Sequence, residues 1–335
     1  FIFLLNWKGN YLQFSKKCKK SCFFPKKKIN ISQGKCKMYE GLRFSAIDIG
    51  SNAIRLLFTR VVLNGGPNFI KESLIRMPLR LGRDAFVNGS ISDELSNKFL
   101  HTMRGFKHMI DAYDPIRYRA CATSALRTAE NGEKLVDYVN ELTGLDIEII
   151  SGKDEAALIL SNHIEQTLKS GRHYIYIDVG GGSTEVTLIF DKKVLASMSF
   201  PIGSVRLLEN KVTPQNWREM RDWIKDRTKD CVSLKAIGSG GNINKIASFL
   251  KKQKGTGIEK NEIRDALAEI NPYDYHSRVV KLGMRPDRAD VITHAGLIYL
   301  NCLEWSDAKK MVVPQVGLPD GIITDLYRMY KNQLK

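Results

Sequence analysis

The sequence predicts an α/β protein made of two similarly built domains that face each other across a cleft. One pattern carries this prediction because it occurs twice. A run of apolar residues that ends in Asp-x-Gly is found at residues 44–50 and again at 174–180. Each copy is followed by a short polar turn and a second apolar run, which is typical of two strands joined by a tight turn. The same unit at the start of both halves indicates two domains of one type.

The first half is predicted to alternate strands with helices. Ser92 is a favoured helix N-cap, and Phe99, Met103 and Phe106 follow it at helical spacing, so they belong to a core face. Gly144 and Gly171 are expected to end two further helices. The predicted elements are strands at 44–50, 54–62, 70–79, 118–123 and 145–150, and helices from Ser92, at 129–143 and at 153–169.

The second half repeats the strand pair and then becomes more helical. Thr213-Pro214 opens a helix, because proline is favoured at the first helical position. The predicted elements are strands at 174–180, 194–200, 234–237 and 311–316, a second strand after the turn at 180–184, helices after Thr213 and Asn242, three helical segments within 260–305, and a last helix at 321–332.

Charge is distributed unevenly along the 335 residues. The formal net charge is +16, and residues 1–37 hold ten lysines and no acidic residue, which leaves +6 for the remainder. Hydrophobic residues at 43% and charged residues at 26% match soluble globular domains, which excludes a disordered, collagenous or disulfide-scaffold chain. The total charge suggests a nucleic-acid partner at first sight, but most of it belongs to the tail, so that partner is not favoured.

Residues 1–37 are expected to lie outside the fold. The first methionine is Met38 and the first strand is predicted from Phe44, so we interpret the tail as upstream sequence read through from an over-extended start. The alternative is a basic arm that binds polyanions. No apolar run approaches the ~18–20 residues of a membrane helix. The scattered Cys121, Cys231 and Cys302 are typical of reduced thiols, so a cytoplasmic location is expected.

Three turns rich in glycine and serine follow apolar strands, and we predict that they bind phosphate. Glycines let backbone amides approach an anion closely, and successive N–H groups in a turn form a concave anion site. A single such turn would be weak evidence, because glycine punctuates any α/β fold. The predicted phosphate-binding residues are Gly50, Ser51, Asn52, Gly180, Gly181, Gly182, Ser183, Thr184, Gly240, Gly241 and Asn242.

Carboxylates stand beside two of these turns. A carboxylate next to a phosphate site would repel the phosphate unless a divalent cation lay between them, and Mg²⁺ prefers one or two carboxylates with waters and substrate oxygens. Asp48, Asp178 and Glu185 are therefore predicted metal ligands, with Mg as the cofactor. An equal alternative for Asp48 is that its side chain caps the turn.

Several strings, in order and over most of the chain from Phe44 to Gly321, resemble the exopolyphosphatase and guanosine pentaphosphate phosphohydrolase family. The family belongs to the actin, Hsp70 and sugar-kinase superfold. The strings are AIDIGSN (46–52), RLGR (80–83), ATSALR (122–127), EIISG (148–152), IDVGGGSTE (177–185), PIGSVRL (201–207), IGSGGN (237–242) and RADVI (288–292).

The resemblance implies two ribonuclease-H-like, actin-like ATPase domains with a cleft for a phosphate chain and Mg²⁺. Residues 43–150 with 315–335 would form the N-terminal domain, and residues 151–314 the second one. The substrate would be inorganic polyphosphate first and guanosine pentaphosphate second. No membrane partner is expected, and a homodimer is one of the assemblies that remain open.

The resemblance also assigns roles to single residues. Glu155 matches the glutamate proposed in the family to activate water; the alternative is that it only caps a helix, where carboxylates are favoured. Arg55 and Arg127 match arginines that would stabilise phosphoryl charge, against the alternative of interdomain ion pairs. Arg83 and Arg206 are weaker candidates for the same lining. Arg288 and Asp290 are expected to fix a helix.

The predicted activity is Mg²⁺-dependent hydrolysis of a terminal phosphoanhydride bond. The alternatives are an ATP-dependent kinase of the same superfold and a phosphate-chain or nucleotide sensor with weak catalysis. The sensor is compatible with Lys153, which occupies a position where family members often have an acidic residue.

Overall fold

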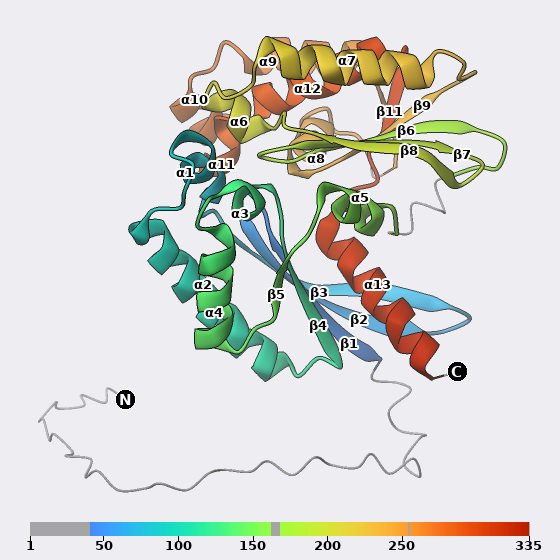
Figure 1. The fold of residues 1–335 in the computed structure, drawn as a ribbon. Helices are drawn as coiled ribbons and strands as arrows, with labels where there is room; N and C mark the ends of the chain where they lie inside the picture. Colours follow the sequence, from blue (N-terminus) through green and yellow to red (C-terminus); the bar gives the residue numbers. More distant parts are fainter. Residues whose placement is uncertain (1–40, 162–167, 254, 335) are drawn as a thin grey trace, which may run out of the picture.

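The computed structural model describes residues 41–161, 168–253 and 255–334. Two sheets with their helices form the two halves of the molecule, one above the other in Figure 1. The predicted tail at 1–37 lies outside the described residues. No helix within the described ranges has the length and the apolar composition that crossing a bilayer requires.

The first sheet has five strands in the order β3-β2-β1-β4-β5. The repeated unit forms an antiparallel hairpin of β1 and β2, and β4 and β5 then add in parallel to β1. Parallel neighbours require crossover connections, and helices supply them. The strands are β1 (Leu42–Ile49), β2 (Ile54–Leu63), β3 (Pro67–Met77), β4 (Arg117–Ala122) and β5 (Ile147–Ile149).

The second sheet has six strands in the order β10-β11-β9-β6-β7-β8. β6 and β7 form the second copy of the hairpin, and β9 lies parallel to β6 as β4 lies parallel to β1. The predicted internal repeat is therefore present in both sheets. The strands are β6 (His173–Val179), β7 (Thr184–Phe190), β8 (Lys193–Phe200), β9 (Lys235–Ser239), β10 (Gly257–Glu259) and β11 (Lys310–Val312).

The helices follow the predicted pattern, and caps explain several of their bounds. The Ser92 hydroxyl accepts a hydrogen bond from the Leu95 amide, Thr213 caps a helix with proline at its first turn, and Gly144 ends another at a φ of 68°. The longer helices are α2 (Asp93–Tyr113), α4 (Gly132–Thr143), α5 (Gly152–Ser161), α7 (Pro214–Thr228), α8 (Gly241–Phe249), α9 (Lys260–Ile270), α12 (Ile292–Trp305) and α13 (Leu318–Gln333).

The sequence misplaced some boundaries and missed three of the short helices. The strand predicted at 311–316 is only β11, and the helix predicted at 129–143 begins at Gly132, because a separate turn of helix precedes it. The predicted helix at 153–169 is helical to Ser161; residues 162–167 lie outside the described ranges, and 168–169 are not helical. The missed helices are α1 (Leu81–Val87), α3 (Ser124–Thr128) and α6 (Ser204–Leu208). Within 260–305, where three helical segments were predicted, α10 (Tyr275–Val280) and α11 (Pro286–Ala289) lie between α9 and α12.

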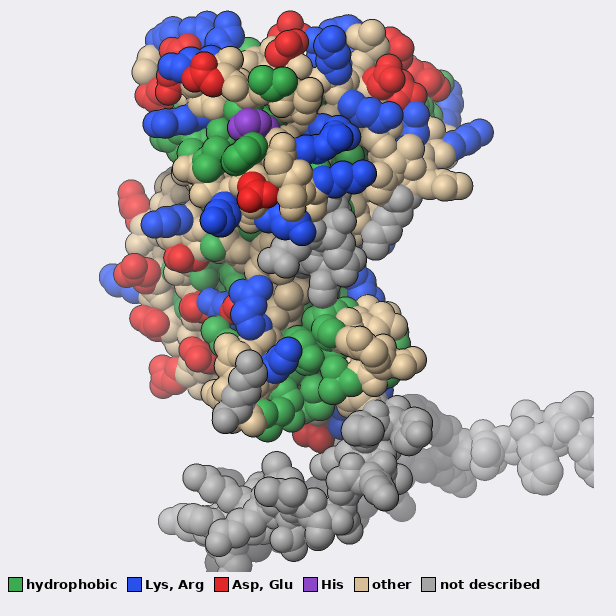
Figure 2. Space-filling model, turned by 90° about the vertical axis from the view of Figure 1, so that its right-hand side faces the viewer, with side chains coloured by type: hydrophobic (Ala, Val, Ile, Leu, Met, Phe, Trp, Pro, Cys, Tyr) green, Lys and Arg blue, Asp and Glu red, His purple; other side chains and the backbone are tan. Residues whose placement is uncertain are grey.

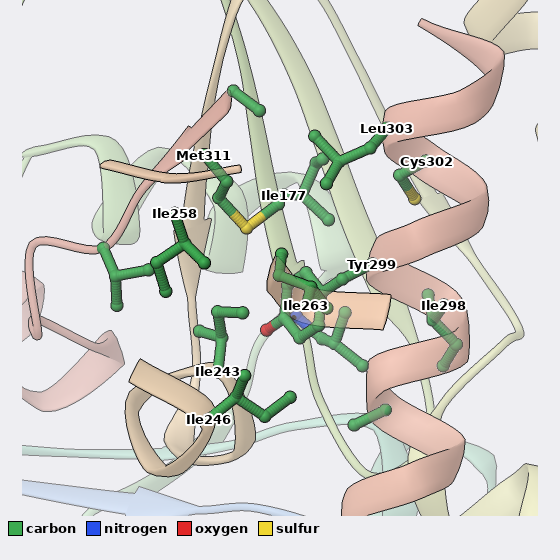
Figure 3. Close-up of a cluster of buried hydrophobic side chains, with 14 of the residues drawn as sticks. Ile177, Ile243, Ile246, Ile258, Ile263, Ile298, Tyr299, Cys302, Leu303 and Met311 are labelled. Carbon is green, nitrogen blue, oxygen red and sulfur yellow. Dashed lines mark hydrogen bonds between the residues drawn. The ribbon is translucent and has the colours of Figure 1, made fainter. Parts of the chain in front are cut away.

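Buried side chains of the second half fix the carboxyl ends of its strands. Figure 3 shows Tyr299 of α12 beside Ile177 of β6 within this apolar cluster. The Tyr299 hydroxyl accepts a hydrogen bond from the Val179 amide at 3.3 Å and donates one to the Ser239 carbonyl. One side chain of the core therefore ties the ends of β6 and β9 together, next to two of the glycine turns.

The C-terminal helix α13 returns to the first sheet. It packs on β1 and against α5, as Figure 1 shows for the red helix. Gly321 allows α13 to approach α5 closely, and the Ser161 hydroxyl of α5 donates a hydrogen bond to the Gly321 carbonyl at 3.2 Å. The division of the chain into domains at 43–150 with 315–335 and at 151–314 stays a prediction. The three cysteines in the described ranges are free thiols, as expected.

We expect Gly321→Ala to lower the melting temperature by roughly 5 °C, because overpacking costs about 1–3 kcal/mol. A Cβ at this position would lie 2.0 Å from the Leu158 carbonyl oxygen, so α13 would have to move away from α5. Gly105→Ala is the control in another helix, where a Cβ has open space and alanine favours the helix. Equal melting temperatures for the two variants, measured by circular dichroism, would contradict the close packing.

Candidate active site

The three predicted glycine turns meet in one narrow cleft between the two halves. The cleft has a volume of about 80 Å³ and is lined by residues of both sheets and by the start of α13. Thirteen of the predicted site residues line it. They are Asp48, Gly50, Ser51, Asn52, Arg55, Glu155, Asp178, Gly180, Gly181, Gly182, Ser183, Gly240 and Gly241.

The second turn is held by its carbonyl groups, which leaves its amides free. The carbonyls of Gly180, Gly181 and Gly182 accept hydrogen bonds from α6, including one from the Arg206 Nε to Gly182 at 3.0 Å. Among the described residues, the amides of Gly181 and Gly182 donate to no protein acceptor. Two adjacent N–H groups without an acceptor form a concave anion site.

Glycine is required where the second turn enters the first half. A Cβ on Gly182 would lie 2.3 Å from the Phe86 ring and 2.4 Å from the Ser124 hydroxyl. Gly240, in the third turn, has a φ of 110°, a backbone conformation that residues other than glycine rarely adopt. The glycines therefore serve the close approach of the two halves as well as the approach of a ligand.

The repeated hairpins place different residues at equivalent positions. Asp48 pairs across its hairpin with Arg55, and Asp178 pairs across its own with Glu185. Arg55 donates to the Asp48 carboxylate at 2.5 Å, so the first pair is an ion pair. The second pair brings two carboxylates together.

Burial makes the second pair hard to ionise. It raises the pKa of Asp178 to about 6 and, together with the charge of Asp178, it raises the pKa of Glu185 to about 7. The Ser199 hydroxyl donates to one oxygen of Glu185 at 2.8 Å. The other oxygen, Oε2, is buried and has no hydrogen-bond partner within the described ranges.

Glu155 completes the cluster of carboxylates from the first turn of α5. Burial and the nearby charge of Glu185 raise the pKa of Glu155 well above its usual range. Ser151 caps the helix by accepting from the Asp154 amide at 3.1 Å, so Glu155 is not its cap. Its Oε2 is buried without a hydrogen bond within the described ranges.

Arg127 is the cation nearest to Glu155. Its guanidinium lies 3.6 Å from the Glu155 carboxylate and donates to the Ile150 carbonyl at 2.5 Å. Neither Arg55 nor Arg127 pairs with a carboxylate of the second sheet. Ion pairs between the halves are instead formed near the end of β3 and at α1. They are Arg76 with Asp287, Arg80 with Asp290 at 2.6 Å, and the longer pair of Arg83 with Glu209 at 4.0 Å.

The donor set fits a divalent cation with few protein ligands. Within the described ranges, no three His, Cys, Asp or Glu side chains are close enough to form a metal site by themselves. Mg²⁺, however, commonly takes one or two carboxylates and completes its shell with waters and substrate oxygens. Asp178 and the unpartnered oxygen of Glu185 suit this role, because a cation beside them would relieve their repulsion. Asp48 already has Arg55 as its partner.

Four other predicted phosphate ligands do not line the cleft. Thr184 is fully buried and donates to the Ile202 carbonyl at 2.5 Å, and Asn242 lies inside the first turn of α8. Arg83 is exposed and lies 4.0 Å from Glu209. Arg206 lies over the Phe86 ring at 3.9 Å and holds the second turn, so it acts on the shape of the turn.

Arg288 lies at the site although the sequence pointed to a role in fixing a helix. Its guanidinium lies against Gly241, where an added Cβ would be 2.8 Å from Nη2. Burial and the like charge of Arg76 lower the pKa of Arg288 to about 10. A half-buried arginine beside other arginines is stabilised by an anion. The sequence feature that could have identified Arg288 as a site residue is its position in the RADVI string.

The chain matches known proteins over most of its length. The sequence model of the Ppx/GppA phosphatase family matches residues 73–329. The chain is 28% identical over 297 residues to a bifunctional 3-dehydroquinate synthase/phosphatase of Fusobacterium nucleatum, which covers 81% of this chain and 44% of that protein. It therefore spans less than half the length of this relative. It is 24% identical to exopolyphosphatase 1 of Mycobacterium tuberculosis, over 84% of this chain and 87% of that protein.

Solved structures agree with the predicted fold. An exopolyphosphatase from Cytophaga hutchinsonii has a TM-score of 0.74 and 22% identity, over 87% of this chain and 98% of that one. The Aquifex aeolicus member of the Ppx/GppA family has a TM-score of 0.69 and 24% identity, over 86% and 98% of the two chains. The prediction of two ribonuclease-H-like halves of the actin-like fold is confirmed.

The buried carboxylates predict an unusual dependence of stability on pH. The pKa of Glu185 is higher in the folded protein than its usual 4.5, so the folded state binds more protons between about pH 4.5 and 7. The free energy of unfolding, measured with a chelator present, should therefore fall as the pH rises from 5 to 8. Glu185→Gln should be more stable than the wild type at pH 8, by on the order of 2 kcal/mol, and no more stable at pH 4.5.

Denaturant titrations at four pH values would measure this effect. Glu141→Gln, which removes an exposed carboxylate, is the matched control and should keep the slope of the wild type. If the free energy of unfolding of Glu185→Gln depended on pH as strongly as that of the wild type, the Glu185 carboxylate would not be the group that destabilises the protein at high pH.

Proposed function

The chain belongs to the Ppx/GppA phosphatase family, and on this premise we propose that it hydrolyses the terminal phosphoanhydride bond of inorganic polyphosphate. One observation carries the proposal. Glu155 is a buried carboxylate with a raised pKa and with an oxygen that accepts no hydrogen bond within the described ranges, and it lines the same cleft as the free amides of the second glycine turn. A base and an anion site therefore face one small space.

Glu155 would act as the general base. A water oxygen attacks the terminal phosphorus while the bridging P–O bond breaks, and Glu155 takes a proton from the water. The products are inorganic phosphate and a chain shorter by one unit. A raised pKa makes the Glu155 carboxylate a stronger base. Arg127, at 3.6 Å, keeps a positive charge beside it.

The remaining parts of the cleft would bind phosphate oxygens. The amides of Gly181 and Gly182 would donate hydrogen bonds to phosphate oxygens. Arg55 lines the cleft, and Arg288 brings a second guanidinium beside Gly241 at its wall. Asp178 and Glu185 would hold Mg²⁺, which when bound would neutralise charge on the transferred phosphoryl group. With these roles, the buried cations of the cleft would face phosphate oxygens and the buried carboxylates would face Mg²⁺ in the complex with substrate.

The size of the cleft favours the end of a chain as the substrate. Its volume of about 80 Å³ is far below the roughly 300–1,000 Å³ of pockets that enclose whole small molecules. Only a terminal group fits, and the rest of the ligand must extend outside. Polyphosphate meets this condition, and guanosine pentaphosphate is the second substrate that we propose.

Glu155→Gln tests the assignment of the base. We expect the rate of phosphate release to fall by about 10²–10⁴-fold, the usual contribution of a general base. Phosphate release is measured with Mg²⁺ on long polyphosphate, on tripolyphosphate and on guanosine pentaphosphate. Glu141→Gln is the control and should keep the activity of the wild type. Release that persists in Glu155→Gln would rule out the assignment, and phosphate transfer from ATP to an acceptor would favour the kinase.

Addition of Mg²⁺ to the protein without substrate tests the metal ligands apart from activity. Binding to the folded state alone raises the melting temperature, and ten times the dissociation constant corresponds to about 1.4 kcal/mol. We expect an increase at pH 8 for the wild type and a much smaller one for Glu185→Gln, which lacks one of the two ligands. An equal increase for both proteins would place the metal elsewhere.

A further inference from the structure

A second cavity, lined by lysines, lies at the end of β9 that is opposite to the active site. Its volume is about 610 Å³, and it lies among the last turn of α7, the beginning of β9, the end of α12 and the beginning of β11. β9 runs from this cavity at Lys235 to the active site at Gly240. At ~3.3 Å per residue, the two sites are at least about 15 Å apart.

Positive charge dominates this cavity. Five lysines line it, against a single aspartate, Asp307. They are Lys225, Lys229, Lys235, Lys309 and Lys310. Figure 2 shows Lys and Arg side chains in blue, interspersed with Asp and Glu in red, on the upper half of the molecule, the half that contains this cavity.

Most of these lysines form no ion pair with a carboxylate in the part of the chain that the structure describes. Lys229 pairs with Asp226 at 3.0 Å. The other four form no ion pair with a described carboxylate, whereas Lys260 and Lys252 nearby pair with Glu304 and Glu262. Unpaired cations that gather around one concave surface repel each other, and an anion in the cavity would remove that repulsion.

We propose that this cavity binds an internal segment of a condensed phosphate chain whose end is cleaved in the active site. The inference rests on the proposed function for the identity of the ligand. Lysine ammonium groups are compact point charges on flexible stems, which suit a chain of phosphates without a fixed bidentate geometry. The active-site cleft admits only a terminal group, so a long chain must bind elsewhere on the surface. A chain of three phosphates is too short to reach both sites.

The double variant Lys225→Gln/Lys309→Gln tests the proposal, because it removes two exposed cations from different walls of the cavity. With long polyphosphate, KM should rise about tenfold while kcat is unchanged, by analogy with the loss of phosphate contacts in nucleic-acid complexes. With tripolyphosphate, both constants should equal those of the wild type. Lys98→Gln/Lys134→Gln removes two exposed lysines from the first half and is the control.

Direct binding separates this proposal from the proposed function. Long polyphosphate is titrated calorimetrically against the full chain with a chelator present, with and without the two substitutions. Weaker binding by Lys225→Gln/Lys309→Gln than by the control supports the cavity even if no substrate is hydrolysed. Equal binding, an equal KM for long chains, or tighter binding of single-stranded RNA than of polyphosphate would overturn the assignment.

Discussion

Repulsion among buried carboxylates is the constraint on which the active site of this protein depends. Burial raises the pKa of Asp178, Glu185 and Glu155, the charge of Asp178 raises the pKa of Glu185 further, and the charges of both raise the pKa of Glu155 further. Two of their oxygens are buried without a hydrogen bond within the described ranges. Buried carboxylates in this arrangement lower the stability of the folded protein unless a cation binds beside them. The surrounding fold must therefore hold the carboxylates in place against their own repulsion.

Three features of the fold supply that rigidity. The paired hairpins fix the aspartates at the ends of β1 and β6, and the Tyr299 hydroxyl fastens the ends of β6 and β9. α13 packs closely against α5, which carries Glu155. Arg76 and Arg80 bind the two halves together through Asp287 and Asp290, near the cleft. The charges that hold the halves together are thus separate from the charges that face the cleft.

The internal repeat explains how one site acquires both signs of charge. Equivalent hairpins carry Arg55 opposite Asp48 and Glu185 opposite Asp178. The first pair is neutral and adds a guanidinium to the cleft, whereas the second leaves negative charge for a cation to balance. A symmetric backbone therefore supports an asymmetric site, with phosphate-binding groups on one side and proposed metal ligands on the other.

The sequence by itself determined the two-fold repeat, the three glycine turns and the position of Glu155, because these depend on local spacing and on turn chemistry. Only the tertiary structure decided which charges meet. Arg288 is far from Gly241 in sequence and lies against it, Arg206 binds the Gly182 carbonyl, and the lysines of the second cavity come from three separate segments. The partner of a buried or clustered charge depends on chain segments that local patterns do not connect.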